Sequence, residues 1–128
     1  MQLCKQENIK LDISMQDIEF DFMNNMDLTS LFANMFDNAV DACKKCDNNK
    51  RRIVLHIHKY NNYVVINLVN SIKQKPEIRE GKLVSTKQNH IGLGMTILTD
   101  VVERYNGNID YSYTDNEFET KIIISTIK

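Results

Sequence analysis

The segment Leu31–Cys43 constrains the fold more than any other, because two kinds of side chain recur along it with helical spacing. At about 100° per residue, one face collects the apolar side chains Leu31, Met35, Ala39 and Ala42. A neighbouring stripe collects Asn34, Asn38, Asp41 and Lys45. Carboxamides at the edge of a buried face are costly unless something engages them, and an amide oxygen is a good Mg²⁺ ligand. From this segment alone, an ordinary surface pair and a ligand site both stay open.

Length, charge and cysteine content exclude several classes of protein. A chain of 128 residues fits one domain with a core of its own, and a net charge of −1 gives no case for binding nucleic acid or an acidic membrane. No apolar run is long enough to span a membrane and the N-terminus has no signal-peptide core, so we expect a soluble, intracellular protein. Cys43 and Cys46 form a CxxC pair without a second pair, which favours core thiols over a metal or redox site.

The remaining periodicities predict the other elements. Apolar alternation predicts strands at Ile9–Ser14, Arg51–Tyr60, Tyr63–Val69, Ile109–Tyr113 and Phe118–Ile127. Helical spacing predicts one helix capped by Asp27 and ending near Cys46, and a second over Gly92–Tyr105, stopped by Asn106-Gly107. This order predicts a two-layer α/β (α+β) sandwich, in which helices cover one face of a mixed, mostly antiparallel sheet.

The long segment Asn70–His90 and the glycines after it form a second candidate site element. The segment has no sustained period, and a loop of this length is usually functional or disordered. In Ile91–Met95 (IGLGM), glycines precede a predicted helix, whose N-terminus offers unpaired N–H groups to a phosphate. Thr86 and Lys87 could add a hydroxyl and a cation. Glycines also begin helices for simple turn reasons, and Lys87 could be an ordinary loop lysine.

Taken together, these motifs resemble the ATP-binding catalytic domain of sensor histidine kinases, within the superfamily that includes gyrase, the ninety-kilodalton heat-shock chaperones and MutL. The residues Asn34–Ala39 (NMFDNA) resemble the family's asparagine box, Leu83–Lys87 (LVSTK) its phenylalanine-and-threonine box, and IGLGM its second glycine box. The opening CKQENIKLDIS resembles the segment leading into this domain in peptide-pheromone receptor kinases of Gram-positive bacteria. The resemblance covers nearly the whole chain.

The resemblance implies ATP and Mg²⁺ as cofactors and assigns a role to each motif residue. Asn38 is the implied metal ligand, with Asn34 beside it and Asp41 on the same helix face. The backbone of Gly92, Leu93 and Gly94 is expected to contact the phosphates, while Thr86 and Lys87 belong to a lid over ATP. Asn70 lies where the family usually has the Asp that reads adenine, and Thr120 matches a family threonine near the adenine.

Three departures from the family pattern affect these expectations. The first glycine box is replaced by Asn70–Gln74, which lacks the usual acid and glycines, so adenine recognition is less secure than the phosphate contacts. His90 replaces the leading glycine of the second box, which stiffens the lid hinge. Asn34 stands at the superfamily's general-base position, and an amide cannot act as a base for water. This favours phosphoryl transfer to a protein over ATP hydrolysis.

The resemblance further implies a cytoplasmic catalytic domain of a two-component, quorum-sensing kinase that is attached to the plasma membrane as a whole. Residues 1–128 are expected to be one catalytic domain, without the sensor and dimerisation domains. Its partners would be the phosphoacceptor histidine of the dimerisation domain and a response regulator, because His56, His58 and His90 lie on a predicted strand or in the lid. Without that acceptor the chain should not autophosphorylate. The alternatives are an anti-sigma-factor-type serine kinase, a degenerate module that holds a partner protein without nucleotide, and a small domain with no ligand.

Overall fold

The computed structural model describes residues 2–75, 78–79, 82–83 and 93–127. Its helices are α1 (Gln2–Gln6), α2 (Asn25–Lys44) and α3 (Leu93–Arg104), with a short 3₁₀ turn at Asn48–Lys50. Its strands are β1 (Lys10–Met15), β2 (Arg52–Tyr60), β3 (Tyr63–Ser71), β4 (Ile78–Arg79), β5 (Lys82–Leu83), β6 (Asn108–Tyr113) and β7 (Glu117–Ser125).

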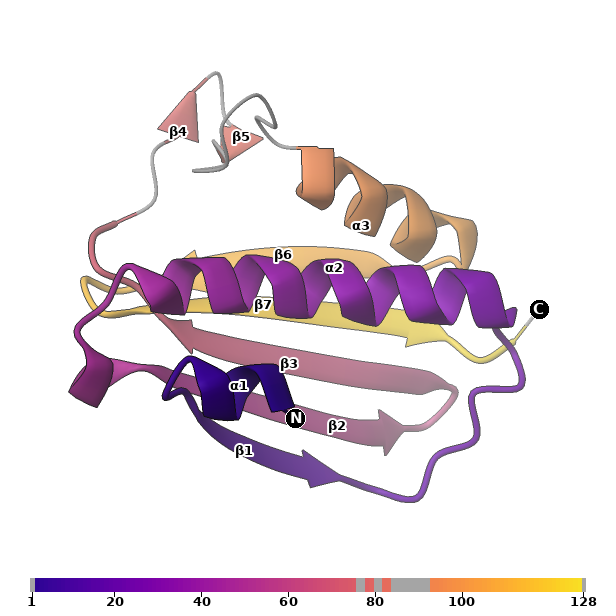
Figure 1. Cartoon of the computed structure of the whole chain (residues 1–128). Coiled ribbons are helices and arrows are strands. Elements are labelled where there is room, and N and C mark those ends of the chain that lie inside the picture. The colour runs from indigo at the N-terminus through magenta and orange to yellow at the C-terminus, as the bar shows by residue number, and fades with distance from the viewer. Residues whose placement is uncertain (1, 76–77, 80–81, 84–92, 128) are drawn as a thin grey trace.

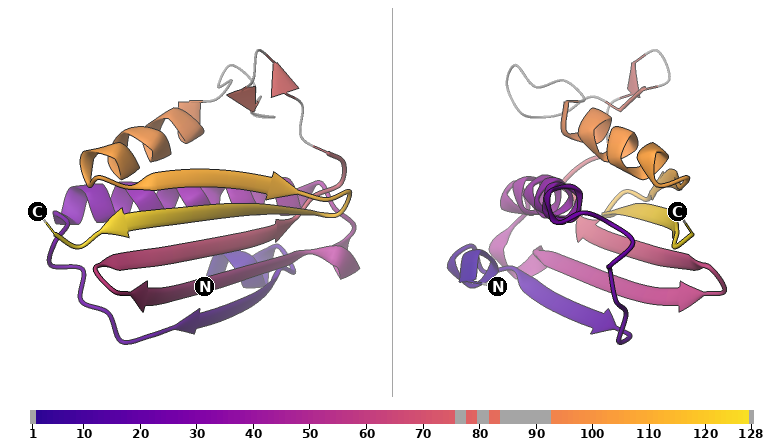
Figure 2. Two further views of the ribbon diagram at one scale, coloured as in Figure 1. Left: turned by 180° about the vertical axis from the view of Figure 1, so that it is seen from behind. Right: turned by 90° about the vertical axis from the view of Figure 1, so that its right-hand side faces the viewer.

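Five strands form one sheet in the order β1-β2-β3-β7-β6, in which β1 and β2 are parallel and all other neighbours are antiparallel. A parallel pair needs a long crossover connection, and α2 provides it between β1 and β2. Figures 1 and 2 show all three helices on one face of this sheet. The predicted two-layer architecture with a mostly antiparallel sheet is confirmed.

The core lies between this face of the sheet and α2 and α3. Alternate residues of each central strand point into it: Ile53, Leu55 and Ile57 from β2, Val64, Ile66 and Leu68 from β3, and Ile122 and Ile124 from β7. The predicted apolar stripe of α2 supplies Leu31, Met35 and Ala39, while Ala42 is only partly buried. Cys43 of α2 is also buried, and α3 supplies Leu98, Val101 and Val102. The helices are therefore held against the sheet mainly by apolar burial.

The prediction that Asp27 caps α2 is wrong. Asn24 is the N-cap: its backbone is extended (φ −73°, ψ 156°), and its Oδ1 accepts a hydrogen bond of 2.7 Å from the backbone N–H of Asp27. Asp27 is the third helical residue, and its carboxylate accepts a hydrogen bond from Asn24 Nδ2 at 3.0 Å. Both residue types cap helices well, so sequence preference alone could not choose between them.

Two further features differ from the sequence-based expectations. The helix α1 was not predicted, and the small β4–β5 hairpin lies within the segment predicted as a loop. Cys4, Cys43 and Cys46 are free thiols buried in the protein, as expected for core cysteines. In the described parts of the chain, no helix combines the length and the apolar character that crossing a membrane requires.

Candidate functional site

The polar stripe of α2 lies at the border of the core. Asn34, Asn38 and Asp41 are each partly buried, while the apolar stripe beside them is buried. The side-chain nitrogen of Asn34 donates a hydrogen bond of 2.7 Å to the backbone carbonyl of Ser30. This bond occupies the amide nitrogen and leaves Oδ1 available as an acceptor. The helix therefore carries two asparagines one turn apart, both partly buried.

A second pair of polar side chains lies in the sheet beneath the helices. Asn70, near the end of β3, is 5% exposed, and Thr120, in β7, is 7% exposed. Asn70 pairs with Phe118 across the two strands, so Thr120 is its diagonal neighbour on the helix-covered face. The side-chain nitrogen of Asn70 donates to the carbonyl of Ser71 at 3.1 Å. The two residues that the family resemblance assigned to adenine are thus adjacent, and their roles stay predictions.

The C-terminal half of α2 lies over this end of the sheet. The thiol of Cys43, on α2, is 3.4 Å from the carbonyl oxygen of Arg52 and 4.0 Å from that of Ser71. Asn38 lies about one and a half turns before Cys43 in the same helix half. The polar stripe of α2 and the Asn70–Thr120 pair therefore belong to the same region of the molecule.

The position of the start of α3 along the helix pair follows from the direction of the two helices. The helices α2 and α3 pack against each other and run in opposite directions (Figure 1), and Asp27 of α2 contacts Arg104 of α3. Asn38 lies 11 residues after Asp27, and Leu93 lies 11 residues before Arg104. Both distances correspond to about 16 Å along a helix. The first residue of α3 is therefore roughly level with Asn38.

Not every residue predicted for the site can be placed. Leu93 and Gly94 are the first two residues of α3, as the predicted helix start requires. Thr86, Lys87, His90 and Gly92 lie outside the described residues. The structure thus places Asn34, Asn38 and Asp41 on one face of α2, Asn70 and Thr120 on neighbouring strands of the sheet, and Leu93 and Gly94 in the first turn of α3.

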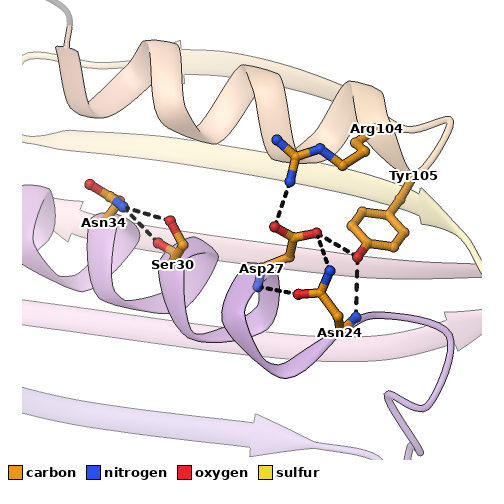
Figure 3. A network of polar contacts seen from close by, with 6 residues as sticks. All are labelled: Asn24, Asp27, Ser30, Asn34, Arg104 and Tyr105. Atoms are coloured by element: carbon orange, nitrogen blue, oxygen red, sulfur yellow. Dashed lines mark hydrogen bonds and ion pairs between the residues drawn. The ribbon is translucent and has the colours of Figure 1, made fainter.

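The sequence analysis missed a polar network at the other end of these helices. Figure 3 shows Asp27 receiving hydrogen bonds from Arg104, the last residue of α3, and from Tyr105, which follows it. Asp27 is 6% exposed. Arg104 Nη1 donates to Oδ1 at 2.5 Å, and the Tyr105 hydroxyl donates to Oδ2 at 2.6 Å. The Tyr105 oxygen also accepts from the backbone N–H of Asn24 at 3.1 Å. We call Asn24, Asp27, Arg104 and Tyr105 the Asp27 clamp.

From the contacts of the clamp we expect the free energy of unfolding to depend on pH in a specific way. The Tyr105 hydrogen bond, followed by the bond and charge of Arg104, lowers the pKa of Asp27 despite its burial. Because the folded-state pKa lies below the unfolded value of about 3.9, the stabilisation is complete above that value and disappears as the pH falls through the folded-state pKa. We expect Asp27→Asn to lower the free energy of unfolding by about 2 kcal/mol at pH 7, and by progressively less below pH 4. Urea unfolding of both proteins across this pH range measures the difference.

The matched control is Asp12→Asn. Asp12 pairs with Arg52 at 3.5 Å, but both side chains are about half exposed. Exposed ion pairs contribute little, so this variant should unfold like the wild type at every pH. A pH-independent difference between Asp27→Asn and the wild type would contradict the assignment of the titrating carboxylate to the clamp.

Tyr111 is a second residue that the sequence analysis missed. It lies on β6 directly opposite Thr120, and its ring packs against Phe118 at a centroid distance of 5.7 Å. Burial raises the pKa of Tyr111 to about 12. Its buried hydroxyl has no hydrogen-bond partner in the part of the chain that the structure describes. Alternation along β6 could have indicated an inward-facing tyrosine, but not its pairing with Thr120.

Apart from the carboxylate of Asp41, the side chains of this site offer neutral oxygen and nitrogen groups. Within the described ranges, no three side chains of His, Cys, Asp and Glu gather in a way that could hold a metal ion. Burial raises the pKa of all three cysteine thiols. Amide oxygens on α2, buried polar groups in the sheet and a helix N-terminus can bind a polar ligand that carries negative charge.

Known structures share this fold across almost the whole chain. The catalytic domain of histidine kinase ThkA, in a nucleotide-free form, aligns with a TM-score of 0.75 and 21% identity, over 98% of this chain and 84% of that one. Histidine kinase AdeS of Acinetobacter baumannii aligns with a TM-score of 0.71 and 11% identity, over 99% of this chain. Full-length ShkA, in complex with AMPPNP, aligns with a TM-score of 0.70 and 11% identity, over 96% of this chain and 27% of that one.

The chain spans 59% of the length of AdeS. A search among curated proteins finds no match. The sequence model of the GHKL domain, by contrast, matches residues 23–125, which include both helices of the site and all but one strand of the sheet. This chain therefore belongs to the GHKL domain family.

Proposed function

We propose that this domain binds ATP with Mg²⁺ and donates the γ-phosphoryl group to a histidine on a separate dimerisation domain. Three elements of a GHKL domain support the proposal: the polar stripe of α2, the buried Asn70–Thr120 pair and the first turn of α3. A nucleotide has a base to be read by buried polar groups and phosphates to be held by a helix N-terminus and a cation.

Asn38 fits the role of a Mg²⁺ ligand. It is partly buried on the exposed side of the apolar stripe, and a neutral amide oxygen is a hard ligand. Mg²⁺ usually takes only one or two protein ligands and completes its shell with water and phosphate oxygens. The absence of a carboxylate cluster is therefore compatible with a metal held between Asn38 and a bound triphosphate. When bound, the ion would neutralise phosphate charge.

The other residues divide the remaining work. Asn34 is held by Ser30 and cannot deprotonate water, which favours transfer of the phosphoryl group over hydrolysis. In the sheet, Asn70 and Thr120 would exchange hydrogen bonds with the adenine edge. The backbone of Leu93 and Gly94, at the start of α3, would face the phosphates, with Gly92, Thr86 and Lys87 contributing from the preceding segment. Catalysis in such a transfer is mainly positioning and charge neutralisation.

The finer assignment concerns the whole protein. We propose a cytoplasmic catalytic domain of a two-component kinase of the peptide-pheromone receptor type, with a dimerisation domain and a response regulator as partners and attachment of the full protein to the plasma membrane. The opening segment CKQENIKLDIS supports the receptor subtype. The solved histidine kinases with this fold, one of them bound to AMPPNP, support the class of reaction.

Calorimetric titration of ATP and of ADP, each with and without Mg²⁺, tests the proposal. We expect Mg²⁺-dependent ATP binding in the micromolar to millimolar range, about −4 to −8 kcal/mol. No binding at millimolar nucleotide would overturn the proposal in favour of a degenerate module that holds a partner protein. One observation favours that second candidate: the Asn70 amide nitrogen is already bonded to the Ser71 carbonyl.

A second assay separates histidine transfer from the related serine kinases. With ATP bound, the domain is mixed with the dimerisation domain of its own kinase, and the stability of the labelled product is measured. Phosphohistidine is lost in acid and survives alkali, whereas phosphoserine survives acid. An acid-stable product would exclude phosphoryl transfer to a histidine.

A further inference from the structure

The Asp27 clamp joins the beginning of α2 to the end of α3. Asp27 receives bonds from Arg104 and Tyr105, and the carbonyl of Tyr105 accepts a bond of 3.3 Å from the backbone N–H of Ser125 in β7. Beyond the helix, Gly107 lies against Ile123 of β7. The end of α3 is therefore fixed both to α2 and to the sheet.

The clamp and the candidate ligand groups share one face of α2. Asn34 follows Asp27 by 7 residues and Asn38 follows it by 11. At 3.6 residues per turn these positions lie within about 20° of Asp27 around the helix axis. Because Asp27 contacts α3, the positions of the two asparagines lie on the side of α2 that is directed toward α3. Figure 3 shows Asn34 on the same helix as Asp27.

A small rotation at the clamp would move the distant end of α3 by a larger distance. The first turn of α3 lies about 16 Å from Arg104, so a rotation of about 10° at the clamp moves that turn by roughly 3 Å. Binding groups must be held to within about 0.5 Å to act together on one ligand. Small errors at the clamp would therefore separate the start of α3 from Asn38.

We propose that Asp27 is a positioning residue that sets the start of α3 relative to the α2 asparagines, and so sets the affinity for the phosphate chain of the nucleotide. This inference rests on the proposed ATP-binding function. Asp27 itself is about 16 Å from Asn38 along the helix and touches no proposed ligand. Its effect passes through Arg104 and Tyr105, and it should spare adenine recognition, because Asn70 and Thr120 belong to the sheet.

The test compares affinities for Mg·ATP and for adenosine in Asp27→Asn. We expect Mg·ATP affinity to fall roughly tenfold and adenosine affinity to stay unchanged. Asp27→Glu, which keeps the charge, should recover part of the loss. Tyr105→Phe removes only the hydroxyl from the clamp and should act in the same direction, so the test survives if Asp27→Asn does not fold.

Two control variants separate positioning from general destabilisation. Arg51→Gln removes a guanidinium that donates to the carbonyls of Glu7, Lys44 and Cys46, around the opposite end of α2. It should lower the unfolding temperature and leave both affinities of the folded protein unchanged. Asp12→Asn makes the same chemical change as Asp27→Asn, in an exposed ion pair on β1. It should change neither stability nor affinity.

Each remaining outcome has one meaning. If the wild type binds Mg·ATP and Asp27→Asn binds it equally well, the positioning role is overturned and the proposed function stands. Equal losses of ATP and adenosine affinity would also overturn it, because they indicate a general structural role. If the wild type binds no nucleotide, the proposed function fails and the inference fails with it. Amide hydrogen exchange without nucleotide adds a direct readout, since Asp27→Asn should speed exchange in α3 and not in β3 or β7.

Discussion

Asn38→Ala is expected to abolish Mg²⁺-dependent nucleotide binding while leaving the fold intact. We expect the Mg·ATP affinity to fall by at least roughly a hundredfold, because even outer-shell partners of a metal typically account for 10- to 100-fold. Asn38 is only partly buried, and alanine favours the helix, so the free energy of unfolding should change by less than about 0.5 kcal/mol. Titration calorimetry with Mg²⁺ and with EDTA measures the affinity, and urea unfolding measures the stability.

Asp37→Ala is the control for this experiment. Asp37 is the preceding residue of α2, is exposed, and lies about 100° away around the helix. Its removal should leave Mg·ATP affinity unchanged. In EDTA, the wild type and Asn38→Ala should bind ATP with similar, weaker affinity. Unchanged Mg·ATP affinity in Asn38→Ala would remove Asn38 from the site.

Gly107→Ala is expected to destabilise the protein strongly. A Cβ at this position would overlap the carbonyl oxygen of Ile123 and would lie 2.9 Å from Cγ1 of Val102. Neither neighbour can move easily, because Ile123 belongs to a central strand and Val102 is fully buried. Overpacking of this kind typically costs 1–3 kcal/mol, and we expect about 3 kcal/mol because the clash involves backbone.

Asn108→Ala serves as the comparison for Gly107→Ala. It changes the next residue, which is exposed at the start of β6, and should alter the free energy of unfolding by less than about 0.5 kcal/mol. Chemical denaturation of both variants, with far-UV circular dichroism as the probe, gives the two values. Equal stabilities would mean that the segment after α3 can shift away from β7 at little cost.

The parts of the fold that could be predicted are those that local periodicity determines. Alternating apolar residues placed the strands, and the α2 stripe placed Leu31, Met35 and Ala39 in the core. The order of elements then predicted one helix layer on one sheet. What periodicity could not give was the pairing of β3 with β7 and of β1 with β2, because these strands are far apart in sequence.

The candidate site divides in the same way. Asn34 and Asn38 could be predicted to share a face because they lie on one helix. Family resemblance added Asn70 and Thr120, which the structure places as diagonal neighbours on adjacent strands. The Asp27 clamp joins residues 77 and 78 positions apart. No local sequence pattern predicts contacts between residues so far apart, and Asp27 was interpreted as a helix cap instead. Tyr111 lies in the predicted strand Ile109–Tyr113, but the sequence analysis did not assign it to the site.

The buried thiols allow local opening of the native protein to be measured by thiol labelling. Cys4 and Cys43 are almost inaccessible, and Cys46 is 8% exposed. Burial raises their pKa values, so little reactive thiolate forms near neutral pH in the folded state. A thiol reagent can therefore modify them only after part of the structure opens, and the labelling rate counts those openings. The three cysteines lie on α1 and around the end of α2, so their labelling rates measure the opening of these two elements. The chain has no tryptophan, and this measurement needs no added probe.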